Sequence, residues 1–305
     1  MKINFSTKFH KPMNKEKNSI QISKVYKLKK EKEIILPLGT CFLDILCTAF
    51  KKKKYKILSD PTKTLSSSMA HKHLRFFFGN FYNPLNLLDN LERIISKKWS
   101  LKNDDFVYSK EFGHFINLHT KARLKTKDLN LLKKRILEID KYFLNELKKS
   151  TVILLSFETT EVWIDKLSKK TWYSFYGNLF TQKCYKNRAQ LKVLDYAALK
   201  EVMNKIIKIL NKVGNKKKII LMTSPNKLWS TYLNKDVQLS DFYSKSTYTS
   251  VFNDLALKNV SYFPALEIVN NINEGKKYRD DYLHLNLATS ENVLEPYFNK
   301  MYFQK

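Results

Sequence analysis

The sequence predicts an α/β protein with three layers, α/β/α, in which helices cover both faces of a central, mainly parallel sheet. Two observations carry this prediction. Helical patterns, with apolar residues three and four positions apart, alternate along the chain with short uninterrupted apolar runs. Such runs are typical of strands buried on both faces. Their alternation with helices is typical of a parallel sheet with right-handed crossovers.

Each element follows from a local pattern. Buried strands are expected at 33–38, 151–157, 218–223 and 260–263. Helices are expected at 42–53, 84–95, 129–147, 199–213 and 246–258. Pro84 suits the first position of its helix, where its missing N–H costs little, and Gly214 is placed to end the fourth helix.

Polar residues and a proline follow the ends of the predicted strands. Thr40, Glu158, Ser224 and Pro264 each come shortly after one of these runs. Parallel strands bring their carboxyl ends to the same edge of a sheet, and chemistry gathers at that edge. We therefore expect these four residues to share one rim.

The composition predicts one globular domain preceded by a polar arm. Hydrophobic residues make up 43% of the chain, which is enough for a packed core and excludes wholesale disorder. Residues 1–32 are polar and lysine-rich, so we expect an N-terminal arm there and a single domain at 33–305. The arm lacks the apolar region of a secretory signal, and no run approaches the length of a membrane span. A cytoplasmic location is expected, and the sequence does not indicate the oligomeric state.

The cysteines and histidines give no sign of a metal site. Cys41, Cys47 and Cys184 are odd in number and lack the spacing of metal ligands, which favours reduced thiols. The histidines form no ligand pattern either. We therefore expect neither a metal nor another cofactor.

The net charge of +28 has two interpretations. Dense positive charge suits an anionic partner such as a nucleic acid or an anionic glycan. However, arginine, which provides the bidentate contacts of specific recognition, occurs at only six positions, and the lysines are mostly scattered. Compositional bias is therefore favoured, and polyanion binding stays open as the alternative. A nucleic-acid-processing enzyme ranks last, because neither a carboxylate cluster nor a phosphate loop is recognisable.

An aspartate and a histidine three positions apart, Asp281 and His284, suggest an acid–base pair. A carboxylate beside an imidazole can fix the tautomer of the ring and support its role as a base. Such a pair needs a nucleophile from elsewhere. Thr40 and Cys41 stand at a predicted strand-to-helix turn, which is a usual place for one.

Six short segments, spread over about residues 33–300, form an ordered set. They are Gly39-Thr40-Cys41-Phe42-Leu43, Phe78-Gly79-Asn80-Phe81-Tyr82-Asn83-Pro84, Ser156-Phe157-Glu158-Thr159-Thr160-Glu161-Val162-Trp163, Thr223-Ser224-Pro225, Tyr262-Phe263-Pro264-Ala265-Leu266-Glu267-Ile268-Val269 and Asp281-Tyr282-Leu283-His284. In sequence and in order they resemble the segments of the GSCFA family, within the broader SGNH (GDSL-like) hydrolase fold.

The resemblance implies an SGNH hydrolase-like, flavodoxin-like fold and a serine-esterase-like site. The roles that it implies are Thr40 as nucleophile, His284 as base, Asp281 as the residue that orients the base, and Thr40, Gly79 and Thr160 as the oxyanion hole. The activity that the resemblance implies is that of an esterase, deacetylase or O-acyl transferase on a small-molecule or glycan ester, including a carbohydrate ester. The alternative is a catalytically degenerate module that binds an anionic glycan or a nucleic acid.

The chain departs from the family pattern at two positions. Thr40 replaces the nucleophilic serine, and its extra methyl group crowds the path of attack and stiffens χ1. Glu158 replaces a glycine, and a carboxylate there would oppose a developing oxyanion unless it points away or is neutralised. Cys41 is an alternative nucleophile, although a structural role is favoured, and Cys41, Asn83 and Glu158 are candidate modulators of the site.

Overall fold

The computed structural model describes residues 28–58, 81–109, 113–120, 126–173, 187–256, 259–272 and 276–303. Most of the expected N-terminal arm, together with Gly79 of the expected oxyanion hole and Cys184, lies outside these ranges. The end of the arm that is described packs onto the domain. Leu28 is buried, and its N–H donates to the carbonyl oxygen of Tyr302 at 2.8 Å.

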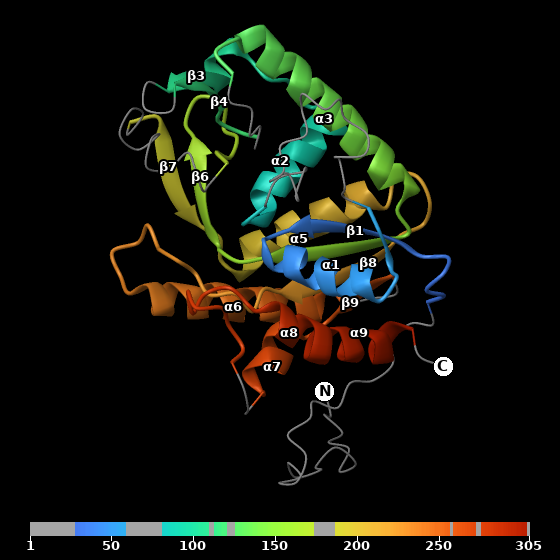
Figure 1. Cartoon of the computed structure of the whole chain (residues 1–305). Helices are drawn as coiled ribbons and strands as arrows, with labels where there is room; N and C mark the ends of the chain where they lie inside the picture. Colours follow the sequence, from blue (N-terminus) through green and yellow to red (C-terminus); the bar gives the residue numbers. More distant parts are fainter. Residues whose placement is uncertain are drawn as a thin grey trace, which may run out of the picture.

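The central sheet has five strands that all run parallel, which confirms the predicted fold class (Figure 1). In spatial order the strands are β2 (Lys56–Ile57), β1 (Ile34–Gly39), β5 (Val152–Phe157), β8 (Lys218–Thr223) and β9 (Val260–Tyr262). Strand β2 escaped the sequence analysis because two residues are too few to form an apolar run.

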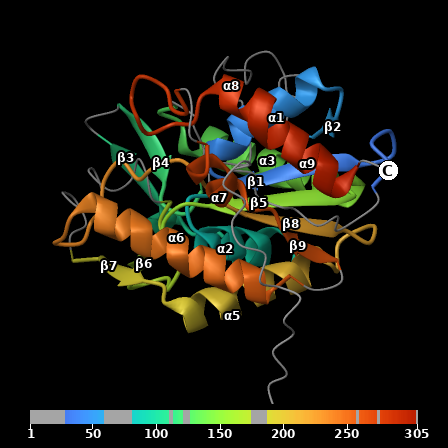
Figure 2. The ribbon, with the colours of Figure 1, turned by 90° about the horizontal axis from the view of Figure 1, so that it is seen from below.

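Helices cover both faces of the sheet, so the molecule has the expected three layers. One face packs against α2 (Pro84–Ile94), α3 (Leu129–Lys149), α5 (Tyr196–Leu210) and α6 (Val237–Asp254). The other face packs against α1 (Phe42–Lys52), α7 (Ala265–Asn270) and α9 (Glu295–Tyr302). Figure 1 shows α2 and α3 on one side of the sheet and α8 and α9 on the other, and Figure 2 shows α1 and α9 side by side over the strands.

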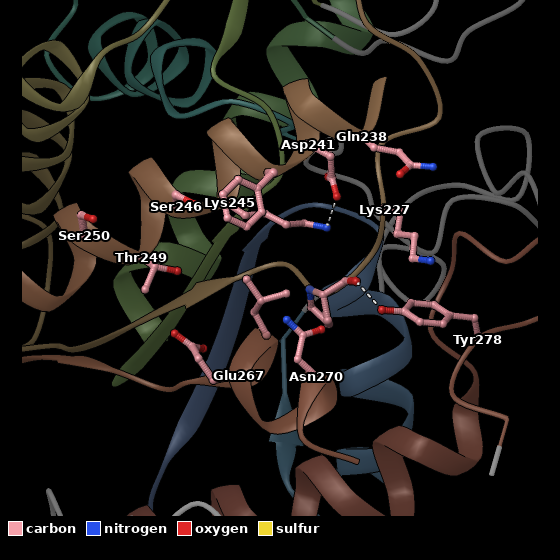
Figure 3. A pocket seen from close by; sticks show the side chains of 13 residues that line it. Lys227, Gln238, Asp241, Lys245, Ser246, Thr249, Ser250, Glu267, Asn270 and Tyr278 are labelled. Atoms are coloured by element: carbon pink, nitrogen blue, oxygen red, sulfur yellow. Dashed lines mark hydrogen bonds and ion pairs between the residues drawn. The ribbon is translucent and has the colours of Figure 1, made fainter. Parts of the chain in front are cut away.

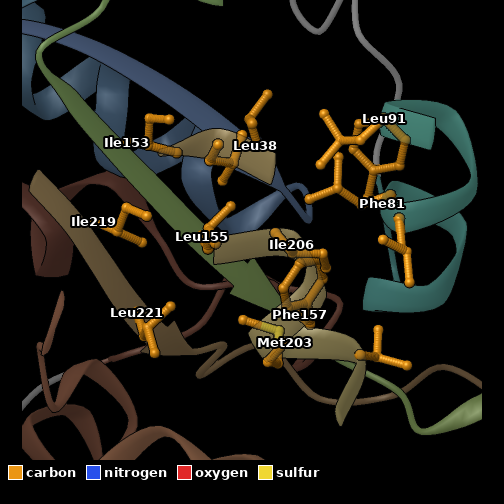
Figure 4. Close-up of a cluster of buried hydrophobic side chains, with 14 of the residues drawn as sticks. Leu38, Phe81, Leu91, Ile153, Leu155, Phe157, Met203, Ile206, Ile219 and Leu221 are labelled. Atoms are coloured by element: carbon orange, nitrogen blue, oxygen red, sulfur yellow. The ribbon is translucent and has the colours of Figure 1, made fainter. Parts of the chain in front are cut away.

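The two-sided burial of β5 explains its uninterrupted apolar sequence. Because strand side chains alternate between faces, Ile153, Leu155 and Phe157 enter the core beneath α2 and α5. Val152 and Leu154 enter the core beneath α1 and α9 instead. Figure 4 shows the first of these cores, where side chains of β1, β5 and β8 meet those of α2 and α5.

The helix boundaries agree with the predictions except near α5 and α6. Helix α5 ends at Leu210, and Gly214 lies in the turn beyond it with a φ of +68°. A Cβ atom on Gly214 would stand 2.7 Å from the carbonyl oxygen of Lys148, so the turn requires glycine. Helix α6 begins at Val237, capped by Asp236, rather than at Ser246. Its first half exposes apolar side chains, which hides the amphipathic pattern.

Several short elements were not predicted. Two antiparallel pairs stand apart from the central sheet in Figure 1. They are β3 (Phe106–Ser109) with β4 (His114–Asn117), and β6 (Glu161–Asp165) with β7 (Ala189–Val193). The short helical segments are η3 (Asn103–Asp105), α8 (Leu287–Thr289) and η4 (Ser290–Leu294). Within the described ranges, no helix is both long enough and apolar enough to span a bilayer.

Candidate functional site

The carboxyl edge of the sheet gathers the residues that follow the strands. Gly39 pairs with Ser156, and Phe157 pairs with Thr223, so the chain leaves β1, β5 and β8 at the same edge. Strands β1 and β5 are neighbours, but β1 continues through α1 to β2 on one side while β5 leads on to β8 on the other. This reversal is where open α/β sheets usually form a ligand crevice, and Thr40 and Glu158 follow its two strands.

Gly39 sets the position of Thr40. Its φ is +153°, and a Cβ atom there would lie only 1.9 Å from the carbonyl oxygen of Ser156, so no other residue fits. The N–H of Thr40 then donates to that same carbonyl at 3.0 Å. The side chain of Thr40 is fully buried, and its Oγ1 has no hydrogen-bond partner in the described part of the chain. A buried hydroxyl without a partner is energetically costly, which is typical of a functional position.

Residues 81–83 lie across the ends of β1 and β5. The N–H of Phe81 donates to the Gly39 carbonyl at 3.0 Å, and the Tyr82 carbonyl accepts the N–H of Glu158 at 3.0 Å. Asn83 caps α2, because its Oδ1 accepts the N–H of Asn86 at 2.9 Å. Its Nδ2 is buried and has no partner among the described residues. The segment that follows Gly79 in the sequence therefore reaches the turn that holds Thr40.

Asp281 and His284 form a hydrogen-bonded pair. The Nδ1–H of His284 donates to Oδ2 of Asp281 at 2.7 Å. In this tautomer Nε2 carries no proton and can therefore accept one. The other carboxylate oxygen accepts the N–H groups of Leu283 and His284, each at 2.9 Å. These backbone N–H groups, the one of His284 foremost, lower the pKa of Asp281 to about 2. The side chains are about one-third exposed, at 36% for His284 and 34% for Asp281.

Asn226 joins the loop that holds His284 to the turn that holds Thr40. Its Nδ2 donates to Sγ of Cys41 at 3.3 Å, and its Oδ1 accepts the N–H of Leu285 at 2.9 Å. One side-chain amide thus holds together the residues that follow Thr40 and His284. The sequence analysis did not single out Asn226, although it comes directly after the Thr223-Ser224-Pro225 segment of the family resemblance.

Cys41 lies beside Thr40 but is not set up as a nucleophile. The pKa of its thiol is raised to about 12, mainly by burial and secondly by the nearby Glu158 carboxyl. The thiol is therefore neutral at ordinary pH, and a neutral thiol is a poor nucleophile. Its hydrogen bond from Asn226 is consistent with the structural role favoured from the sequence.

Glu158 is a buried carboxyl group, with 5% of its surface exposed. Its side chain forms no hydrogen bond or ion pair with another residue in the described ranges. Burial raises the pKa of Glu158 to about 8, while the Lys245 ammonium opposes this shift and Asp241 adds to it. Lys245 and Asp241 form an ion pair of 2.7 Å on α6. At neutral pH the Glu158 carboxyl is therefore mainly protonated and uncharged.

Thr160 faces α6 and is already bonded there. Its N–H donates to Oγ of Ser244 at 3.2 Å, and its Oγ1 lies 3.1 Å from the same atom. A role in the oxyanion hole would require Thr160 to exchange these bonds for bonds to a ligand. Across the described ranges, no three His, Cys, Asp or Glu side chains cluster closely enough to hold a metal ion.

Together, the fold and this edge define a three-layer α/β protein with a buried hydroxyl at Thr40 and an aspartate–histidine pair in a loop that Asn226 ties to the same turn. A sequence model of the GSCFA family matches residues 34–297, and the chain belongs to that family. No curated protein sequence matches the chain.

Proposed function

We propose that the protein hydrolyses or transfers the acyl group of an ester, with Thr40 as nucleophile, His284 as base and Asp281 as its orienting partner. This is the activity that the resemblance to SGNH hydrolases implies. The observation that carries the proposal is the Asp281–His284 hydrogen bond of 2.7 Å in a loop that Asn226 ties to the Thr40 turn. Hydrogen bonding to Asp281 keeps the proton on Nδ1, so Nε2 is the atom that takes a proton.

The reaction proceeds in two steps, acylation of Thr40 and then deacylation. Nε2 of His284 takes the Oγ1 proton of Thr40 as Oγ1 attacks the carbonyl carbon, and the carbonyl electron pair moves to its oxygen. When the tetrahedral intermediate collapses, the C–O bond to the alcohol breaks, and the imidazolium gives the proton to the leaving alkoxide. Water, or an acceptor alcohol, then attacks the acyl-threonine by the same route and releases the acid or a new ester.

The oxyanion needs hydrogen-bond donors close to Thr40. The N–H of Thr40 itself is bonded to Ser156, so it is not available in this conformation. Helix α1 begins at Phe42, and the N–H groups of Leu43 and Asp44 donate to the carbonyl oxygens of Thr40 and Cys41, each at 3.1 Å. The N–H groups of Cys41 and Phe42 have no recorded acceptor among the described residues, as is usual at the start of a helix. These two groups and the amide of Gly79 are the proposed donors, with Thr160 as a further group when it releases Ser244. A neutral Glu158 carboxyl removes the repulsion that a carboxylate would cause.

Access to Thr40 is a further requirement. Because the residue has no exposed surface, an acyl group reaches Oγ1 only when the groups that cover it move aside. The threonine methyl group adds to this crowding. Both features favour a small acyl group, such as acetyl, over a long chain.

Hydrolysis of p-nitrophenyl acetate by the purified full-length protein tests this function. Wild type should turn the ester over, and His284→Ala and Thr40→Ala should each lose about a hundredfold or more in kcat/KM. Wild-type activity that survives both substitutions unchanged would contradict the proposal.

A second candidate function is polyanion binding by a site that has lost catalysis. The net charge of +28 and the threonine in place of serine at position 40 favour it. It predicts no turnover of any ester, together with binding to heparin or a DNA duplex that weakens steeply as salt rises. Binding that does not respond to salt would count against it.

A further inference from the structure

Exposed apolar side chains are concentrated in the segment 229–243 and in the loop that holds His284. Among the described residues, eleven large apolar side chains are exposed, and six of them belong to this part of the chain. We call these six residues the apolar face: Trp229, Tyr232, Leu239, Phe242, Tyr243 and Tyr282. Single exposed apolar residues are normal on a protein surface, but a group of them usually marks an interaction site.

Hydrogen bonds join the parts of the chain that form the apolar face. The N–H of Lys227 donates to the Leu283 carbonyl at 3.0 Å. The N–H of Leu228 donates to Oδ1 of Asp241 at 3.1 Å. These bonds hold three segments together, 227–229, 241–243 and 282–283. Their exposed side chains therefore share one region of the surface.

The first half of α6 contributes a stripe to this region. Leu239, Phe242 and Tyr243 are three and four positions apart, so they lie along one side of the helix. Their exposed fractions are 64%, 73% and 39%. Phe242 also borders a pocket of about 610 Å³ that Lys227 and Tyr278 line. Figure 3 shows Lys227 and Tyr278 close together beside the start of α6, so the stripe continues onto the neighbouring loops.

Basic side chains border the apolar face. Lys227, Lys235 and Arg279 are exposed, and within the described ranges none of them forms an ion pair. The Lys235 ammonium lies 5.4 Å from the centre of the Tyr243 ring, and the Lys227 ammonium lies 4.9 Å from that of Tyr278. These three positive charges are therefore available to an anionic partner.

The carboxylates of this region are mostly paired within the protein. They pair as Asp241 with Lys245, Asp280 with Lys276, and Asp281 with His284. Asp236 caps the N-terminus of α6 by accepting the N–H of Gln238. The charge that the region presents to a partner is therefore positive.

The charge of the whole chain distinguishes between partners. A net charge of +28 opposes the approach of a second copy, and a symmetric dimer through this face would place its cations near their own copies. A nucleic acid would attract the cations but would leave Leu239 and Phe242 without an apolar partner. At a bilayer surface, apolar and aromatic side chains enter the headgroup region, while basic side chains stay beside the lipid phosphates. An anionic bilayer therefore fits both sets of side chains.

We propose that the protein docks onto an anionic lipid bilayer through the apolar face. The positive charge of the chain supplies the long-range attraction, and the apolar face determines which side of the protein contacts the lipid. The face lies on the bilayer and does not cross it. Because Tyr282 belongs to the loop that holds His284, docking turns this loop toward the lipid. The docking itself does not depend on the proposed esterase function.

Co-sedimentation of the full-length protein with lipid vesicles tests the proposal. We would compare vesicles of phosphatidylglycerol and phosphatidylcholine in equal parts with vesicles of phosphatidylcholine alone. The test variant carries Trp229→Ser and Phe242→Ser. The matched control carries Leu137→Ser and Leu167→Ser, which remove side chains that are 66% and 73% exposed elsewhere on the surface. Wild type and control should bind the anionic vesicles equally, and the apparent Kd of the test variant should rise about tenfold or more.

Tryptophan fluorescence shows whether the apolar face enters the lipid. Of the four tryptophans, only Trp229 is exposed, at 69%. Anionic vesicles should shift the wild-type emission to shorter wavelength, because the indole ring leaves water. Trp229→Phe keeps an aromatic ring at this position, so it should still bind the vesicles but lose the shift.

Three results would overturn the proposal. The first is no binding to anionic vesicles. The second is equal binding of wild type and the test variant without an emission shift, because general attraction of a positive chain would then be sufficient. The third is a dimer or a DNA complex that the test variant loses and the control keeps, together with unchanged vesicle binding, which would assign the face to that partner. Melting temperatures of the variants identify any loss that comes from misfolding, and Trp229→Phe then still tests insertion.

Discussion

The Nδ1–H of His284 donates to Oδ2 of Asp281 at 2.7 Å, within a loop whose backbone N–H groups hold the other carboxylate oxygen. The two side chains are three residues apart and partly exposed, so neither forms part of the hydrophobic core. The backbone N–H groups of the loop fix the Asp281 carboxylate, and the fixed carboxylate orients the His284 ring. This arrangement makes the pair suitable for substitution without loss of the fold.

Asp281→Asn should reduce kcat for p-nitrophenyl acetate by about a hundredfold or more, because an amide can present a donor to Nδ1 and favour the wrong tautomer. The matched control is Asp280→Asn. Asp280 is the preceding residue, its side chain is 96% exposed, and its partner is Lys276 on the surface. Equal loss in both variants would show that the loop, rather than the Asp281–His284 pair, is what matters.

Thr40→Val should abolish hydrolysis without destabilising the protein. Valine keeps the shape of threonine and removes a buried hydroxyl that has no partner within the described residues. Removing an unsatisfied group should leave the melting temperature unchanged or raise it, by a free energy on the order of 1 kcal/mol. A clear fall in melting temperature would indicate that Oγ1 is bonded in the native protein, and would argue against its being a free nucleophile.

Thr40→Ser should raise kcat for the same ester, because the methyl group that crowds the attack is removed. A misplacement of about 1 Å can cost on the order of a hundredfold in rate, so a gain of about tenfold is a reasonable expectation. Steady-state kinetics with p-nitrophenyl acetate measure it. A large loss of rate in Thr40→Ser would mean that the methyl group positions the hydroxyl rather than obstructs it.

The thiols of Cys41 and Cys47 should resist modification in the native state. Burial raises the pKa of each thiol to about 12, so neither forms much thiolate at about pH 8. Titration with a disulfide reagent should modify both only after denaturation, and Cys41→Ala should retain hydrolysis. Rapid labelling of native Cys41, with loss of activity, would instead favour the thiol as nucleophile.

The sheet was predictable because its strands are buried on both faces. The continuous apolar run at β5 and the similar run at β8 have few structural interpretations other than buried strands. Parallel pairing of the strands then places Thr40 and Glu158 at the same edge of the sheet. The two-residue strand β2 and the two antiparallel pairs were missed because they are short and only partly buried.

Residues that act through tertiary contacts could not be found from the sequence. Nothing local distinguishes Asn226, whose role depends on Cys41 and Leu285 coming together from distant parts of the chain. Lys245 and Asp241 look like an ordinary surface pair at helical spacing, yet the fold places them beside the buried Glu158. The sequence analysis left open whether the Glu158 carboxylate would oppose an oxyanion. The burial of Glu158 and its effect on protonation appear only in the folded structure.

Glu158 should make the proposed hydrolysis slower above about pH 8. Burial raises the pKa of its carboxyl to about 8, with Lys245 and Asp241 on α6 and Cys41 and Tyr248 as its other titratable neighbours. Below this pH the neutral acid leaves a developing oxyanion undisturbed. Above it, a buried negative charge opposes both the oxyanion and substrate entry. Glu158→Gln should keep the neutral shape and remove this alkaline fall.

The same ionisation should appear in the stability of the protein. Because the folded pKa of Glu158 lies above its ordinary value of 4.5, protonation favours the folded state. Its stabilising contribution is complete below about pH 4.5 and is lost as pH rises through about 8. Melting temperature should therefore fall more steeply in wild type than in Glu158→Gln between about pH 4.5 and about pH 8, and kcat should do so above about pH 8. Glu201→Gln, at a side chain that is 67% exposed, is the control and should follow wild type. Identical profiles of melting temperature and kcat in all three proteins would show that Glu158 is either ionised throughout or remote from the reacting groups.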